Sequence, residues 1–262
     1  MFIRELLSFQ INSNAYILKK LQIRDLFLLS QNNEKWTIWT YPIQLHGIGR
    51  KRLKKYRFGL GARLNQLAHY YGIDVHVDLN PGDFVLDIGA NIGEFSLFAL
   101  NRKASVVAVE PDTLIFKCLE KNISHKRGTI GLINAAIAES SGEKEFFSAP
   151  HSADSSLIEP ANFNDKYSTA CVTLDELYFK YNLNHVDLIK CDAEGGEPEV
   201  FAEASKALSV TKAVTVSCGP ERKGEFTVGA VCRILELNNF TVKVVDGYRP
   251  QTTVIGHNKD ML

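Results

Sequence analysis

A short glycine loop constrains the fold of this chain more than any other feature of the sequence. Residues 87–93 read Asp-Ile-Gly-Ala-Asn-Ile-Gly; they begin at the end of the apolar run Phe84–Ile88 and precede the helix-like stretch Glu94–Leu100. A strand that ends in glycines and leads directly into a helix gathers free backbone amides and the positive end of the helix dipole in one place. In an open α/β sheet, this is the crevice where a ligand binds.

The chain after the Asn80–Asp83 turn alternates between strand-like and helix-like segments. Strands are expected at Phe84–Ile88, Ser105–Val109, Thr129–Ala138, Val186–Cys191, Ala213–Ser217, Phe240–Val245 and Thr252–Gly256, with Glu143–Phe147 and Ala170–Thr173 as edge strands around a loop. Helices are expected at Glu94–Leu100, Asp112–Ile123, Leu174–Tyr181, Pro198–Leu208 and Val228–Leu237. This alternation predicts an α/β fold with a doubly wound, mostly parallel sheet covered on both faces.

The first 79 residues have a less regular pattern, so we expect an N-terminal extension at 1–79 and a ligand-binding domain at 80–262. A chain of 262 residues is long enough for one such domain with an appendage. Within the extension, the pattern favours helices over residues 14–29 and Arg63–Tyr71, and a short strand over Trp36–Ile43.

The spacing of the loop distinguishes between two kinds of cofactor. A dinucleotide fingerprint requires Gly-x-Gly-x-x-Gly, but counting from Gly89 places Asn91 and Glu94 where the next two glycines belong. The spacing present, an acid followed by Gly-x-x-x-Gly, suits a nucleoside that carries an amino acid. Glu110 ends the next strand, where a carboxylate can accept hydrogen bonds from both ribose hydroxyls. The pattern therefore predicts a cofactor site and makes a nicotinamide oxidoreductase the weaker alternative.

Several segments resemble the FkbM family of methyltransferases. They are Asp87–Gly93, Glu110-Pro111, Asn134–Ala136, Thr173–Leu177 and Asp187–Pro198, which reads Asp-Leu-Ile-Lys-Cys-Asp-Ala-Glu-Gly-Gly-Glu-Pro. The likeness covers about residues 80–210, and the last motif is the most specific. It implies a seven-stranded, Rossmann-like sheet of the class I methyltransferases, S-adenosyl-L-methionine as the methyl donor, and an acceptor oxygen on a sugar, a polyketide or a similar small molecule.

The resemblance also assigns roles to individual residues. The methionyl part of the donor would lie on the loop, at Asp87, Gly89, Ala90, Asn91 and Gly93. Glu110 would bind the ribose, and the adenine would lie beside the third strand, at Asn134, Ala135 and Ala136. The chain departs from the family near Ser217-Cys218, where the family often has a glutamate; Glu221 is the nearest replacement. The first 79 residues match only loosely, and the resemblance therefore implies no particular acceptor; we expect this part to serve the acceptor or an oligomer interface.

Charged residues follow the fourth predicted strand, at the edge of the sheet where ligands bind. Strand alternation places Lys190 and Asp192 on the same side. Methyl transfer requires an acceptor oxygen that is held in line and relieved of its proton. We therefore predict Asp192 and Glu194 as the base or orienting groups and Lys190 as a third catalytic candidate, although Lys190 could simply neutralise Asp192.

Other carboxylates and one histidine are weaker candidates. Glu197 is as well explained as an acid in the first turn of a helix, and His151 and Asp154 lie in a loop after the third-strand region. We predict no metal site, because the spacing of the carboxylates matches no metal-binding loop.

Basic residues are concentrated in one part of a chain whose formal net charge is zero. No acid occurs between Lys35 and Ile73, and Arg50–Arg57 contains six basic residues in eight. Such a run is either a solvated helix face or a contact for an anionic acceptor. Since the donor site is expected in the later sheet, we expect this basic segment to leave donor binding unaffected.

Two further classes of protein remain as alternatives. A nucleic-acid methyltransferase is disfavoured because the chain lacks an Asn/Asp-Pro-Pro-Tyr/Phe loop, an RNA-binding motif and a net positive charge. A non-catalytic protein that retains the donor-binding fold is opposed by the intact Gly89, Gly93 and Glu110. Five scattered cysteines without a Cys-x-x-Cys pair, and no apparent signal peptide or membrane span, lead us to expect a cytoplasmic protein.

Overall fold

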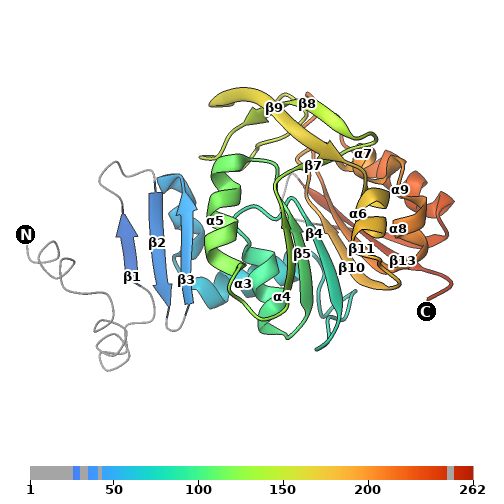
Figure 1. The fold of residues 1–262 in the computed structure, drawn as a ribbon, viewed down its shortest axis with the longest axis horizontal. Helices are drawn as coiled ribbons and strands as arrows, with labels where there is room; N and C mark the ends of the chain where they lie inside the picture. Colours follow the sequence, from blue (N-terminus) through green and yellow to red (C-terminus); the bar gives the residue numbers. More distant parts are fainter. Residues whose placement is uncertain (1–25, 30–34, 41–42, 247–250, 262) are drawn as a thin grey trace, which may run out of the picture.

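A seven-stranded sheet forms the centre of the fold (Figure 1). The structure, a computed structural model, describes residues 26–29, 35–40, 43–246 and 251–261. The strands lie in the order β12 (Phe240–Asp246), β13 (Thr252–Asn258), β11 (Thr211–Cys218), β10 (Val186–Cys191), β4 (Phe84–Ile88), β5 (Ser105–Val109) and β6 (Thr129–Ile133). Neighbours from β11 to β6 are parallel, and β13 is antiparallel to β11 and β12. The predicted doubly wound, mostly parallel sheet is confirmed.

Helices cover both faces of this sheet. One face carries α3 (Leu60–Tyr70), α4 (Glu94–Asn101) and α5 (Thr113–Ile123), and the other carries α6 (Leu174–Lys180), α7 (Glu197–Ala202), α8 (Ser205–Ser209) and α9 (Val228–Leu237). Strand alternation divides the apolar residues between the two cores, so that Val85 belongs to the first and Leu86 to the second. The single helix expected at Pro198–Leu208 is two helices, because Glu203 (φ −117°, ψ 54°) leaves the helical conformation.

The third expected strand also divides. Its first part is β6, whereas β7 (Ala136–Ile137) pairs with β9 (Asp165–Val172) in a separate sheet that includes β8 (Gly142–Ser148). The side chain of Asn134 sits at the break and donates to the carbonyl oxygens of Glu110 and Pro111, at 2.9 and 3.0 Å. The expected edge strands thus form a small sheet of their own above the ends of the main strands (Figure 1).

The described N-terminal residues combine a small antiparallel sheet with two helical segments. An antiparallel sheet of β1 (Leu26–Leu29), β2 (Lys35–Thr40) and β3 (Ile43–Ile48) precedes the 3-10 helix η1 (Arg50–Tyr56) and α3. The helix expected at 14–29 lies mostly outside the described residues, and its end forms β1; the expected strand at Trp36–Ile43 corresponds to β2 and the start of β3.

The N-terminal sheet is attached to the main domain through α5. The Asn122 side chain accepts from the His46 backbone N–H at 2.7 Å and donates to the His46 carbonyl at 2.9 Å. Buried residues of β2, β3, η1 and α3 belong to the same hydrophobic cluster as those of α4 and α5. The extension therefore packs as part of one core with the sheet, and the domain division at residue 79 stays a prediction.

Within the described ranges, no helix is both long enough and apolar enough to cross a membrane. The five cysteines are free, and all but Cys232 are buried. The compartment of the protein stays a prediction.

Candidate active site

The glycine loop connects β4 to α4 and touches the segment that follows β10. Gly89 has a φ of +66°, and a Cβ atom at this position would lie 1.9 Å from the carbonyl oxygen of Asp192. Gly93 has a φ of +87°, and a Cβ atom there would lie 2.8 Å from a methyl group of Leu119. Both positions require glycine, since a side chain would separate the loop from β10 or from α5.

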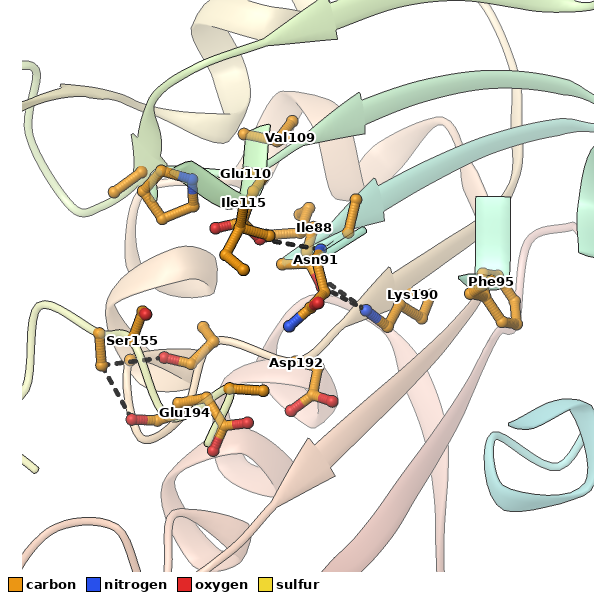
Figure 2. A pocket seen from close by; sticks show the side chains of 18 of the residues that line it. Ile88, Asn91, Phe95, Val109, Glu110, Ile115, Ser155, Lys190, Asp192 and Glu194 are labelled. Carbon is orange, nitrogen blue, oxygen red and sulfur yellow. Dashed lines mark hydrogen bonds between the residues drawn. The ribbon is translucent and has the colours of Figure 1, made fainter. Parts of the chain in front are cut away.

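A buried ion pair lies beneath this loop. Asp87 is completely buried, accepts from Ser96 Oγ at 2.6 Å, and lies 3.1 Å from Lys190 Nζ. Lys190 Nζ also donates to the carbonyl oxygens of Gly89 and Ile88, at 2.8 and 3.2 Å (Figure 2). Burial opposes the charge of Lys190, but Asp87 and Asp192 outweigh it and raise the pKa of Lys190. The ammonium group therefore holds the loop, and neither Asp87 nor Gly93 lines the pocket above it.

One side of that pocket carries Glu110, as the sequence predicts. Its two carboxylate oxygens accept the backbone N–H groups of Asn91 and Asp112, each at 2.8 Å. Burial raises the pKa of Glu110 to about 7. Around it, the lining is apolar and is formed by Val109, Pro111, Ile115, Ala135, Ala136, Ile137 and Phe146. Asn134 itself is exposed and braces the backbone at Glu110 and Pro111, so it shapes the pocket from outside.

The opposite side carries Asp192 and Glu194, which lie across the pocket from Glu110 and Ile115 (Figure 2). The Tyr71 hydroxyl donates to Asp192 Oδ2 at 2.6 Å. Burial, together with the charge of Asp192, raises the pKa of Glu194 well above the usual carboxyl range. Asp192 accepts the Tyr71 hydroxyl on the same side of the pocket, so the two carboxyl groups differ in their surroundings.

The weaker candidates lie elsewhere. Glu197 begins α7, where its carboxylate accepts from the Gly195 N–H at 2.9 Å and from Thr227 Oγ1 at 2.8 Å, so it is an acid of the first helical turn. Asp154 and Glu221 line a neighbouring groove together with Glu194. His151 lines neither the pocket nor this groove. Among the residues that the structure describes, no group of three or more His, Cys, Asp or Glu side chains is arranged to hold a metal ion.

The N-terminal part supplies a wall of the pocket that the sequence did not predict. This N-terminal wall consists of Arg52, Lys55, Arg63, Leu67 and Tyr71, from η1, α3 and the residue after it. Arg52 is only 4% exposed, and its Nη2 donates to Asn91 Oδ1 at 2.8 Å. Arg52 of the basic segment therefore contacts the glycine loop. The expectation that this segment leaves donor binding unaffected stays a prediction. The run of basic residues was visible, but its sequence did not show which of them points inward.

Glu94 links the N-terminal wall to α4. Its Oε1 accepts from Tyr56 Oη and from Arg63 Nε, both at 2.8 Å. Burial alone would raise the pKa of Glu94, but Arg63 and Arg52 outweigh it and lower that pKa to about 2. Glu94, which stands in the place of the missing third glycine, is thus charged at neutral pH and anchors η1 and α3.

The strand order with its antiparallel β13, the glycine loop after β4 and the acid that follows β5 together define a class I methyltransferase. The family model described as the methyltransferase FkbM domain matches residues 87–242, which is more than half of the chain. The chain belongs to the FkbM family of methyltransferases.

Two curated relatives illustrate the range of the family. The chain is 25% identical over 180 residues to the hexuronic acid methyltransferase AglP of Haloferax volcanii, a match that covers 68% of this chain and 72% of the relative. It is 26% identical over 163 residues to the 31-O-demethyl-FK506 methyltransferase FkbM of Streptomyces tacrolimicus, covering 50% of this chain and 63% of the relative. Among solved structures, the magnesium protoporphyrin IX methyltransferase ChlM from Synechocystis PCC 6803 with bound SAM matches with a TM-score of 0.46 and 13% identity, over 79% of this chain and 83% of that one.

Proposed function

We propose that this protein is an S-adenosylmethionine-dependent O-methyltransferase that acts on a hydroxyl group of a sugar, a glycan or a similarly small molecule. The observation that carries the proposal is a single pocket in which the glycine loop and Glu110 face Asp192 and Glu194. The glycine loop and Glu110 suit a donor nucleoside, whereas Asp192 and Glu194 suit an acceptor that loses a proton.

The residues present fit the donor. The Glu110 carboxylate is positioned by two backbone amides and can accept from the ribose hydroxyls, while the apolar lining beside it suits an adenine ring. Backbone at Gly89 and Asn91 would meet the methionyl part. When bound, S-adenosylmethionine supplies an electrophilic methyl group on a sulfonium whose thioether leaves without a proton. Lys190 is a positioning residue in this proposal, because its ammonium group holds the carbonyl oxygens of the loop.

On the acceptor side, Asp192 is the proposed base. Its carboxylate takes the hydroxyl proton as the acceptor oxygen bonds to the methyl carbon and the carbon–sulfur bond breaks. Tyr71 orients this carboxylate through the 2.6 Å hydrogen bond to Oδ2. Glu194 lines the same side of the pocket, where burial raises its pKa, and it is the proposed group that holds the acceptor in line.

A second groove, which shares Asp192 and Tyr71 with the pocket, supports an acceptor with a negative charge. It is lined by Lys54, Lys55, Arg57, Phe58, Ala62, Arg63, Gln66, Leu67, Tyr70, Tyr71, Asp192 and Gln251. Cations outnumber carboxylates in this lining, and aromatic rings beside them suit the apolar face of a sugar. The relative from Haloferax volcanii is named for a hexuronic acid, which agrees with this chemistry. An acidic sugar is therefore the proposed acceptor class.

The proposal is tested by incubating the protein with S-adenosylmethionine labelled in the methyl group and a panel of uronic acid glycosides, neutral glycosides and polyketide alcohols. We expect label in an acidic glycoside and, with the Asp192→Asn variant, incorporation that is slower on the order of 10²-fold. Donor binding without transfer to any acceptor of the panel would favour a non-catalytic protein, and transfer to nucleic acid would contradict the acceptor class.

A further inference from the structure

The guanidinium group of Arg52 lies inside the pocket with part of its hydrogen-bonding capacity unused. Arg52 belongs to η1, lines the pocket and is 4% exposed. Its Nη2 donates to Asn91 Oδ1 at 2.8 Å and lies 3.9 Å from Glu94 Oε2. Within the part of the chain that the structure describes, the buried Nε and Nη1 have no hydrogen-bond acceptor.

A buried donor without an acceptor is unfavourable, because folding has removed its water and supplied nothing in exchange. Most buried polar atoms in proteins have a partner, so two such atoms on one cation call for an explanation. A ligand group that accepts hydrogen bonds and carries a negative charge would satisfy both needs.

The charges around Arg52 also favour an anion. Lys55 and Arg63 line the same pocket as Arg52, and the carboxylates whose charges act on Lys55 are Glu94 and, to a smaller extent, Glu194. Glu94 accepts from Tyr56 and Arg63 through one oxygen and carries one negative charge, against the three positive charges of Arg52, Lys55 and Arg63. The surroundings of the Arg52 guanidinium group therefore carry a net positive charge.

The position of Arg52 indicates which anion it meets. Its partner Asn91 belongs to the glycine loop, and the Asn91 backbone N–H is bound by Glu110, the proposed ribose acid. A donor that lies along this loop, with its ribose at Glu110, extends its amino-acid end toward Arg52. We propose that Arg52 binds the α-carboxylate of S-adenosylmethionine, so that a residue of the N-terminal extension completes the donor site.

This inference rests on the proposed function, and its test uses binding rather than turnover. Calorimetry would compare S-adenosylhomocysteine with its decarboxylated analogue, the same amine-bearing thioether nucleoside without the carboxylate. The wild-type protein should bind S-adenosylhomocysteine on the order of 10- to 100-fold more tightly, as a charge-assisted hydrogen bond implies. Arg52→Gln should bind both nucleosides with the affinity that the wild type shows for the analogue. Lys54→Gln, an exposed change on the same helix, should keep the wild-type preference.

Unchanged binding of the analogue by Arg52→Gln shows that the pocket is still folded. If that variant does not fold, Arg52→Lys serves instead: a reduced preference supports the inference, and a full wild-type preference overturns it. The inference is also overturned if the wild type binds both nucleosides equally, or if Arg52→Gln keeps its preference and only raises the KM of the acceptor. Each of these results leaves the proposed function intact. If the wild type binds neither nucleoside, both the inference about Arg52 and the proposed function are contradicted.

Discussion

The two walls of the pocket differ in how much of them the sequence reveals, and also in their electrostatics. The sheet wall is the wall formed at the ends of the sheet strands by Gly89, Glu110 and Asp192. Glu110 in this wall and Glu94, which contacts the N-terminal wall, are both 5% exposed. Burial raises the pKa of Glu110 to about 7, whereas Arg63 and Arg52 overcome the same effect and lower the pKa of Glu94 to about 2. The same side chain, equally buried, thus titrates near neutral pH at Glu110 and stays charged at Glu94, where it anchors the N-terminal wall.

The largest expected effect comes from the contact between the glycine loop and β10. Gly89→Ala places a Cβ atom 1.9 Å from the Asp192 carbonyl oxygen at a φ of +66°, so we expect loss of detectable donor binding and destabilisation by more than about 2 kcal/mol. In the control Gly229→Ala, no heavy atom lies within 4 Å of the new Cβ atom. That variant should change the free energy of unfolding by less than about 1 kcal/mol and bind the donor normally. Urea unfolding measures the free energy of unfolding, and calorimetry measures donor binding. Donor binding by Gly89→Ala with the wild-type affinity would contradict the loop geometry.

The next effect tests the acidic end of the pocket. Asp192→Asn should lower kcat on the order of 10²-fold while the Kd of the donor changes little, because Asp192 acts on the acceptor. Tyr71→Phe removes one hydrogen bond to that carboxylate and should lower kcat on the order of 10-fold. A variant Asp192→Asn with wild-type kcat on the true acceptor would show that the carboxylate is structural.

The pH dependence of stability should separate the two walls. Glu94 has a pKa lowered from 4.5 to about 2, so its contribution is present above pH 4.5 and is lost as the pH falls toward 2, by an amount on the order of 3 kcal/mol. Glu110 has a pKa raised from 4.5 to about 7, so its ionisation lowers stability as the pH rises from 4.5 to 7. Urea unfolding across pH should show that Glu94→Gln removes the acid loss and Glu110→Gln reduces the decline toward neutrality. Interchanged effects of the two variants would contradict these assignments.

The smallest effect concerns the exposed part of the basic segment. Lys54→Gln combined with Arg57→Gln should raise the KM of an acidic acceptor about 2- to 5-fold, since exposed charge interactions are weak and screened by salt. The donor Kd and the KM of a neutral acceptor should not change. Equal KM values for the wild type and the double variant at low and high salt would leave these side chains as a solvated surface.

The sheet wall was predictable from the sequence because its residues occupy the ends of consecutive strands. The order of strands in an α/β sheet then brings Gly89, Glu110 and Asp192 to one edge without further information. The N-terminal wall was not predictable, because its place depends on long-range packing of η1 and β3 against α4 and α5. Arg52 and Arg57 look alike in the sequence, yet one is buried on the loop and the other is exposed. The break after β6 was missed for a similar reason, since β7 leaves the main sheet to pair with β9, a strand distant in the sequence.

The most direct test of the central claim is a calorimetric titration of the unmodified protein with S-adenosylmethionine and, separately, with NAD. We predict binding of S-adenosylmethionine at micromolar affinity or tighter, a free energy of about 8 kcal/mol or more, and no measurable binding of NAD. Tight binding of NAD with no heat from S-adenosylmethionine would contradict the account.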